Sequence, residues 1–155
     1  MEKIHRRIVF AKWFTVFWAV FFLICTLLGH RIAAAYLAVN TAARASFLQT
    51  MQLPVLLVLG YACGACVLVL LYRLVLFLTN MENGLFFTDV NIAHLRTVSV
   101  LFMAIALLVA GIAVLYSLFF LSISFAAAFL SFIVRIVADI FVQAESMKDE
   151  LDLTI

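Results

Sequence analysis

The chain has 155 residues, of which 68% are hydrophobic and 12% charged, and its formal net charge at pH 7 is +2. Soluble domains carry about a quarter charged residues, and a globule of this length cannot bury so much apolar surface, so lipid is expected to be its main solvent. The small net charge, and the lack of a basic cluster with interleaved aromatic residues beyond the N-terminus, argue against direct nucleic-acid binding. The composition predicts an all-α integral membrane protein.

The first apolar segment, residues 9–29, follows an N-terminus that is rich in basic residues, namely Lys3, Arg6, Arg7 and Lys12. A cleaved signal peptide is one interpretation, since the small residues Ala33-Ala34-Ala35 follow it. Phe10 and Trp13 near the expected interface favour an uncleaved membrane helix instead. The alanine-rich loop that comes next allows a short helix at the membrane surface.

A second span is predicted at residues 53–78, because Pro54 stands where a helix can begin without losing a hydrogen bond. Gly60 and Gly64 form a small-xxx-small face on which another helix can pack. Cys63 and Cys66 form a CxxC motif with two interpretations. They are either small packing residues in mid-helix or a redox pair, which needs an accessible, stabilised thiolate. The mid-helix position and the lack of a second cysteine pair favour packing.

Residues 79–96 are the longest polar interruption between two apolar blocks, and they predict a helix end followed at once by a helix start. Gly84 can take the left-handed conformation that ends a helix. Thr88 offers an N-cap hydroxyl, and Phe87 before it can pack on Ile92 in the next turn. We therefore expect a tight, specified turn here.

The uncharged run from Thr97 to Val134 is too long for one span. It predicts two spans, at residues 97–117 and 121–143, with a break around Ser117 to Ser124. The acidic, amphipathic residues 144–155 then form a tail. The chain is expected to be one membrane domain over residues 1–155, a four-helix bundle with both termini on one side.

The basic residues give an expected orientation. With the N-terminus inside, the inner segments hold Lys3, Arg6, Arg7, Lys12, Arg73, Arg96 and Lys148, whereas the outer loops hold Arg31 and Arg44. The positive-inside rule then places the N-terminus, the turn at residues 79–96 and the tail in the cytoplasm.

The last predicted span carries one stripe of small and polar residues, spaced three or four apart: Ser124, Ala128, Ser131, Arg135, Asp139, Gln143 and Ser146. Charges inside a span are costly and normally face protein or water. The candidate intramembrane polar network is Arg73, Ser131, Arg135 and Asp139. The structural alternative is an ion pair between Arg135 and Asp139, with Arg135 snorkelling to the interface. The functional alternatives are an ion or substrate path and a contact that changes when a partner binds.

The turn and the tail form a candidate partner-binding surface, with the residues Glu82, Gly84, Phe86, Phe87, Thr88, Asn91, Arg96, Asp152, Leu153 and Ile155. Acidic and apolar residues alternate in the tail, a pattern suited to docking on a partner or folding back on the turn. The alternative is a solvated C-terminus that caps the bundle. Metal-ligand spacing, phosphate loops and nucleophile elbows are absent from the sequence, so we expect no metal, no cofactor, no catalytic residue and no enzyme activity.

The run Arg73…Glu82-Asn83-Gly84…Phe87-Thr88…Asn91…Leu95-Arg96, with the C-terminal Leu151-Asp152-Leu153-Thr154-Ile155, resembles the YoaS-like family of small bacterial membrane proteins of unknown function. The resemblance covers nearly the whole chain and implies four helices in the bacterial cytoplasmic membrane. It also implies a partner, because genes of this family often lie beside one for a small helix-turn-helix regulator. It implies no reaction.

These patterns favour a membrane-bound regulatory protein that binds or sequesters a cytosolic partner, such as a small helix-turn-helix transcription regulator, through its turn and tail. The alternative is a subunit of a small oligomeric channel or transporter that uses the polar face of the last span. Membrane lipid and further copies of the chain are the other expected partners.

Overall fold

The computed structural model describes residues 2–39, 51–85 and 88–152, and nearly all of them lie in five α-helices. The helices are α1 (Glu2–Leu27), α2 (Gly29–Val39), α3 (Gln52–Glu82), α4 (Asp89–Leu115) and α5 (Phe119–Asp152). The all-α prediction is confirmed. Each of α1, α3, α4 and α5 contains an apolar stretch long enough to cross a membrane, which indicates a multi-pass membrane protein.

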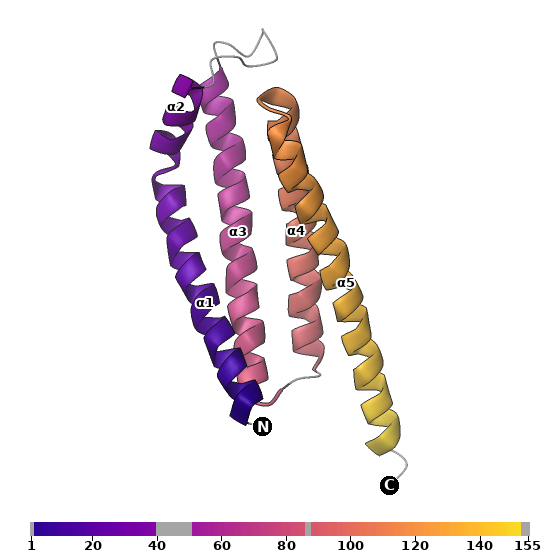
Figure 1. Cartoon of the computed structure of the whole chain (residues 1–155). Helices are drawn as coiled ribbons and strands as arrows, with labels where there is room; N and C mark the ends of the chain where they lie inside the picture. The colour runs from indigo at the N-terminus through magenta and orange to yellow at the C-terminus, as the bar shows by residue number, and fades with distance from the viewer. Residues whose placement is uncertain (1, 40–50, 86–87, 153–155) are drawn as a thin grey trace.

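The four long helices alternate in direction and lie in a row, with α1 packed on α3, α3 on α4 and α4 on α5 (Figure 1). The start of α1, the turn between α3 and α4, and the end of α5 all lie at one end of the molecule, which we call the terminal end. The turn between α4 and α5 lies at the opposite, distal end, together with α2. α1 and α5 thus form the two edges of the row.

α2 continues α1 after a break at Leu28. The Leu28 N–H still donates to Ile24 O at 3.0 Å, and the Leu28 carbonyl accepts from the Ile32 N–H at 3.1 Å. α2 packs on α3 at the distal end. The short helix allowed by the alanine-rich composition is therefore present, as a continuation of the first membrane helix.

α4 is the central helix of the packed core. A cluster of buried side chains between α3, α4 and α5 contains Leu70, Val98, Ile105, Ala106, Val109 and Ala127. A second cluster, with Phe77, Leu95 and Ala138, lies closer to the terminal end. These clusters join α3, α4 and α5 into one packed unit, and α1 is attached to it through α3.

The break between the last two long helices falls at Tyr116–Leu118, at the start of the range predicted from Ser117 to Ser124. Ser124 lies inside α5, where its hydroxyl donates to the Ala106 carbonyl of α4 at 2.8 Å. α4 and α5 also extend further than the predicted spans toward the terminal end, since α4 begins at Asp89 and α5 continues to Asp152.

Candidate functional site

The turn at the terminal end is fixed by its backbone. Gly84 has φ of +80°, the left-handed conformation expected from the sequence. The Gly84 N–H donates to Met81 O at 3.1 Å, and the Leu85 N–H donates to Asn80 O at 3.0 Å. Both bonds satisfy carbonyls in the last turn of α3, those of Met81 and Asn80.

Thr88 is the N-cap residue of α4, as predicted, with φ of −141° and ψ of 146°. The predicted side-chain cap is wrong, because the Thr88 hydroxyl makes no capping hydrogen bond. The Thr88 carbonyl instead accepts from the N–H groups of Asn91, at 2.9 Å, and Ile92, at 3.1 Å, near the start of α4. The predicted packing of Phe87 on Ile92 lies outside the described residues.

Asn91 holds the two sides of this turn together. Its side chain is completely buried, accepts a hydrogen bond from Asn80 Nδ2 at 2.9 Å, and donates from Nδ2 to the Leu85 carbonyl. The prediction that Asn91 contacts a partner is therefore wrong for this conformation, because no part of the side chain reaches the surface. Its amide is used inside the turn.

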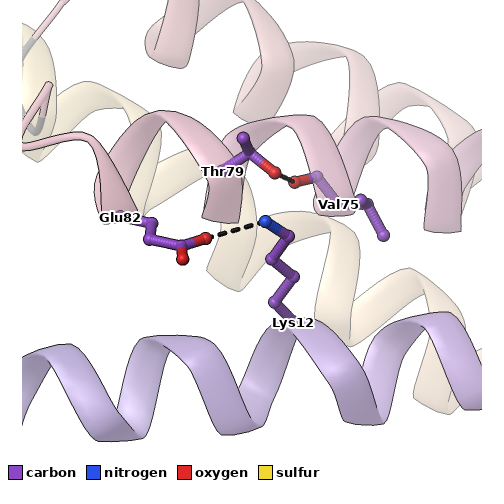
Figure 2. Close-up of polar contacts among 4 residues, drawn as sticks. All are labelled: Lys12, Val75, Thr79 and Glu82. Atoms are coloured by element: carbon purple, nitrogen blue, oxygen red, sulfur yellow. Dashed lines mark hydrogen bonds and ion pairs between the residues drawn. The ribbon is translucent and has the colours of Figure 1, made fainter.

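Lys12 and Glu82 join α1 to α3 at the same end. The Lys12 Nζ donates to Glu82 Oε2 at 2.7 Å, and both side chains are about a quarter exposed (Figure 2). On the same stretch of α3, the Thr79 hydroxyl donates to the Val75 carbonyl one turn back, within the helix. Glu82, a candidate partner-binding residue, is thus already engaged by α1.

The other candidate partner-binding residues differ in accessibility. Gly84 and Arg96 are exposed, and Asp152 is the last residue of α5. Phe86, Phe87, Leu153 and Ile155 lie outside the described residues. Met147, one of the apolar residues that alternate with acidic ones in the tail, is 66% exposed, and two apolar side chains outside the candidate residues are also exposed near this end, Leu85 at 51% and Val90 at 57%. The sequence pattern that could have selected these two residues is an apolar residue within an otherwise polar segment.

The predicted intramembrane network is divided among separate places. Arg73 is half-buried on α3 and interacts electrostatically with His94 of α4. Ser131 is buried against α4, where its hydroxyl donates to Ser99 O at 2.8 Å and the Ser99 hydroxyl donates to Ser131 O at 2.9 Å. These reciprocal bonds bring the α4 and α5 backbones close together, as small polar residues do in membrane helix pairs.

Arg135 and Asp139 remain outside that contact. Both are exposed on α5, and in the described part of the chain neither forms an ion pair or hydrogen bond. The ion pair expected between them as the structural alternative is therefore absent from this structure. The order of the two residues explains part of the missing ion pair. A cation placed four residues before an anion on a helix pairs less well with it than an anion placed four residues before a cation.

His94 is buried on α4, and among the described residues its Nδ1 has no hydrogen-bond partner. Within residues 2–39, 51–85 and 88–152, no group of three or more His, Cys, Asp or Glu side chains is arranged to hold a metal ion. His94 of α4 interacts electrostatically with Arg73 of α3, so it belongs to the contact between these two helices.

The two glycines expected to pack a helix have different surroundings. A Cβ on Gly64 would stand 2.9 Å from Thr26 Oγ1, so this glycine lets α1 approach α3. A Cβ on Gly60 would have no neighbour within 4 Å, so no helix of the described chain packs on Gly60, and the packing of a helix from another molecule there stays a prediction. Gly60 borders a mostly apolar cavity of about 480 Å³ toward the distal end.

The CxxC cysteines are free thiols, and both pack against the buried cluster between α3, α4 and α5. Cys63 also borders the apolar cavity, together with Cys25 of α1. These surroundings support the interpretation of Cys63 and Cys66 as small packing residues.

The fold and this site define a class of protein, an all-α protein with four helices able to cross a membrane and a turn specified by a buried asparagine. The chain belongs to the family described as "Protein of unknown function (DUF2975)", whose model matches residues 8–155. No curated protein and no solved structure matches the chain.

Proposed function

We propose that this protein is a membrane-bound regulatory protein whose terminal end holds a cytosolic protein partner, such as a small helix-turn-helix transcription regulator. The observation that carries the proposal is the combination, at this end, of a turn fixed by a buried asparagine with exposed apolar side chains around it. A simple connector between two membrane helices needs neither. Exposed apolar residues beside a buried, hydrogen-bonded asparagine suit the docking of a protein surface.

The length of α5 supports the same function. Its 34 residues measure about 50 Å at ~1.5 Å per residue, whereas the hydrocarbon core of a bilayer is about 30 Å thick. The apolar residues lie at its start, and Glu145, Lys148, Asp149, Glu150 and Asp152 lie in its last turns. The end of α5 therefore projects beyond the apolar stretch at the terminal end, where Met147 is exposed.

The cytoplasmic placement of the terminal end and the choice of a DNA-binding partner rest on the sequence. The positive-inside rule favours the cytoplasm. The resemblance to YoaS-like proteins, in the bacterial cytoplasmic membrane, favours the small regulator. In this mechanism the protein sequesters the regulator at the membrane and releases it when the packing of the helices changes.

Photo-crosslinking tests the proposal. A photoreactive residue is placed in living cells at Leu85 or at Met147, both exposed at the terminal end, and the captured proteins are identified by mass spectrometry. The control position is Leu118, which is exposed in the turn between α4 and α5 at the distal end. The same cytosolic DNA-binding protein is expected at Leu85 and Met147 and not at Leu118. Capture of nothing, or of further copies of the chain alone, contradicts the proposal.

The second candidate function, a subunit of a small oligomeric channel or transporter, is favoured by the exposed charges of Arg135 and Asp139 on a membrane-spanning helix. Buried Ser131 bonds to Ser99 instead of facing an open path. Ion flux through vesicles that contain the purified protein distinguishes the two functions, because the regulator needs no flux.

A further inference from the structure

Two opposite charges lie one turn apart on the edge helix of the row and have no partner among the residues that the structure describes. Arg135 and Asp139 are both exposed on α5, within the stretch Phe119–Met147 that is able to cross a membrane. Among the described residues, the ion pair that forms is Lys12 with Glu82, far from these two. An ionised side chain inside a span is costly, so such groups normally face protein or water.

Contact with lipid alone does not explain how both charges are stabilised. A long arginine side chain can snorkel to the headgroups, and an anionic headgroup can pair with it. An aspartate reaches much less far, and an anionic headgroup repels it. A partner for this face therefore has to offer a cation and an anion together, at about the same depth in the membrane.

The surface beside the two charges has room for another helix. Arg135 borders a hollow of about 460 Å³ between α4 and α5, which Val100, Ala104, Leu107 and Phe132 also line. Val100, Leu107 and Phe132 are each more than half exposed.

We propose that this face of α4 and α5 binds the same face of a second copy of the chain, in a two-fold symmetric dimer in which Arg135 of each copy pairs with Asp139 of the other. A two-fold axis repeats every contact, so one helix that carries both charges supplies two ion pairs. Copies inserted in the same orientation place identical residues at equal depth. The two positions differ by only ~6 Å along the helix, within the reach of an arginine side chain. This inference does not rest on the proposed function.

Charge reversal tests the pairing. Arg135→Asp puts two acidic groups on each copy, and Asp139→Arg puts two basic groups on each copy, so either variant alone meets like charges in the dimer. Energy transfer between chains tagged with two fluorescent proteins, measured in native membranes, is expected to show self-association weakened roughly tenfold or more for each. Arg31→Asp, an exposed reversal on α2, is the matched control and is expected to associate like the unchanged chain.

The decisive samples combine the two reversals. Co-expressed Arg135→Asp and Asp139→Arg chains are expected to associate with each other, because every cross-pair is again opposite in charge. The double variant R135D/D139R is expected to associate with itself for the same reason. A monomeric unchanged chain, single reversals that associate normally, or a mixture that fails to associate each overturns the proposal. A loss of self-association with Arg135→Asp but not with Asp139→Arg also overturns the proposal, and indicates that Arg135 binds a lipid headgroup instead.

Discussion

Asn91 is a polar residue whose complete burial is balanced by hydrogen bonds to both sides of the turn. Removing its amide would leave Asn80 Nδ2 and the Leu85 carbonyl without these partners, and a buried polar group without a partner costs about 1–3 kcal/mol. We therefore predict that Asn91→Ala lowers the free energy of unfolding by about this amount, measured by titrating the protein in mild detergent with sodium dodecyl sulfate.

Asn83 provides the matched control for this substitution. It is an asparagine of the same turn, but its side chain is exposed. Asn83→Ala is expected to leave the unfolding free energy within about 0.5 kcal/mol of the unchanged chain, as surface substitutions usually do. Equal effects of Asn83→Ala and Asn91→Ala would show that the buried amide does not hold the turn.

At the scale of the helices, the contact of α1 with α3 depends on the absence of a side chain at Gly64. A Cβ there would lie 2.9 Å from Thr26 Oγ1, and that hydroxyl is held by its 2.8 Å bond to the Phe22 carbonyl. Gly64→Ala is expected to lower the unfolding free energy by about 1 kcal/mol or more, through overpacking. The double variant G64A/T26A is expected to recover most of the loss, because alanine at position 26 removes the crowding atoms.

Gly60→Ala is the internal comparison, since it makes the same change one turn earlier on α3, where a Cβ has no neighbour within 4 Å. We expect an unfolding free energy equal to that of the unchanged chain or slightly higher, because alanine favours helix more than glycine does. A loss as large as that of Gly64→Ala would contradict the packing described for α1 and α3.

The helices themselves could be predicted from the sequence because their signals are local. The apolar lengths predicted four spans, Gly84 marked the end of α3, and Thr88 marked the start of α4. The side-chain contacts could not be predicted, because each depends on a neighbour far away in the chain. Gly60 and Gly64 look alike in sequence, and only the position of Thr26 on another helix distinguishes them.

The same reason limits prediction of the candidate site. The polar stripe on the last span was expected to act as one network, since a helical period places its members on one face. Ser131 lies at the side of that face that meets Ser99, whereas Arg135 and Asp139 lie further round and stay exposed. Which part of a stripe is buried depends on where α4 packs, and periodicity carries no information about that.

At the scale of the whole molecule, the row of helices places every element of the proposed function at one end. The fixed turn, the ion pair of Lys12 with Glu82 and the projecting end of α5 all lie at the terminal end. The apolar cavity, which α2 helps to line, lies toward the distal end. The proposed partner at the terminal end would therefore lie beside segments of all four long helices, α1, α3, α4 and α5. A change in how those helices pack can alter its binding, which regulated release requires.

The orientation of this row in the membrane is the prediction on which the cytosolic partner depends. In a chain whose three cysteines are replaced by alanine, single cysteines are placed at Leu85, at the terminal end, or at Leu118, at the distal end, both of them exposed positions. A maleimide that cannot cross membranes, added to sealed cells, is expected to label Leu118→Cys at once and Leu85→Cys only after the membrane is opened. We expect this labelling pattern because basic residues gather around the terminal end, and the positive-inside rule places such segments in the cytoplasm. The reverse pattern would remove the terminal end from the cytosol and with it the proposed partner, whereas labelling of both sites from outside would contradict an odd number of crossings between them.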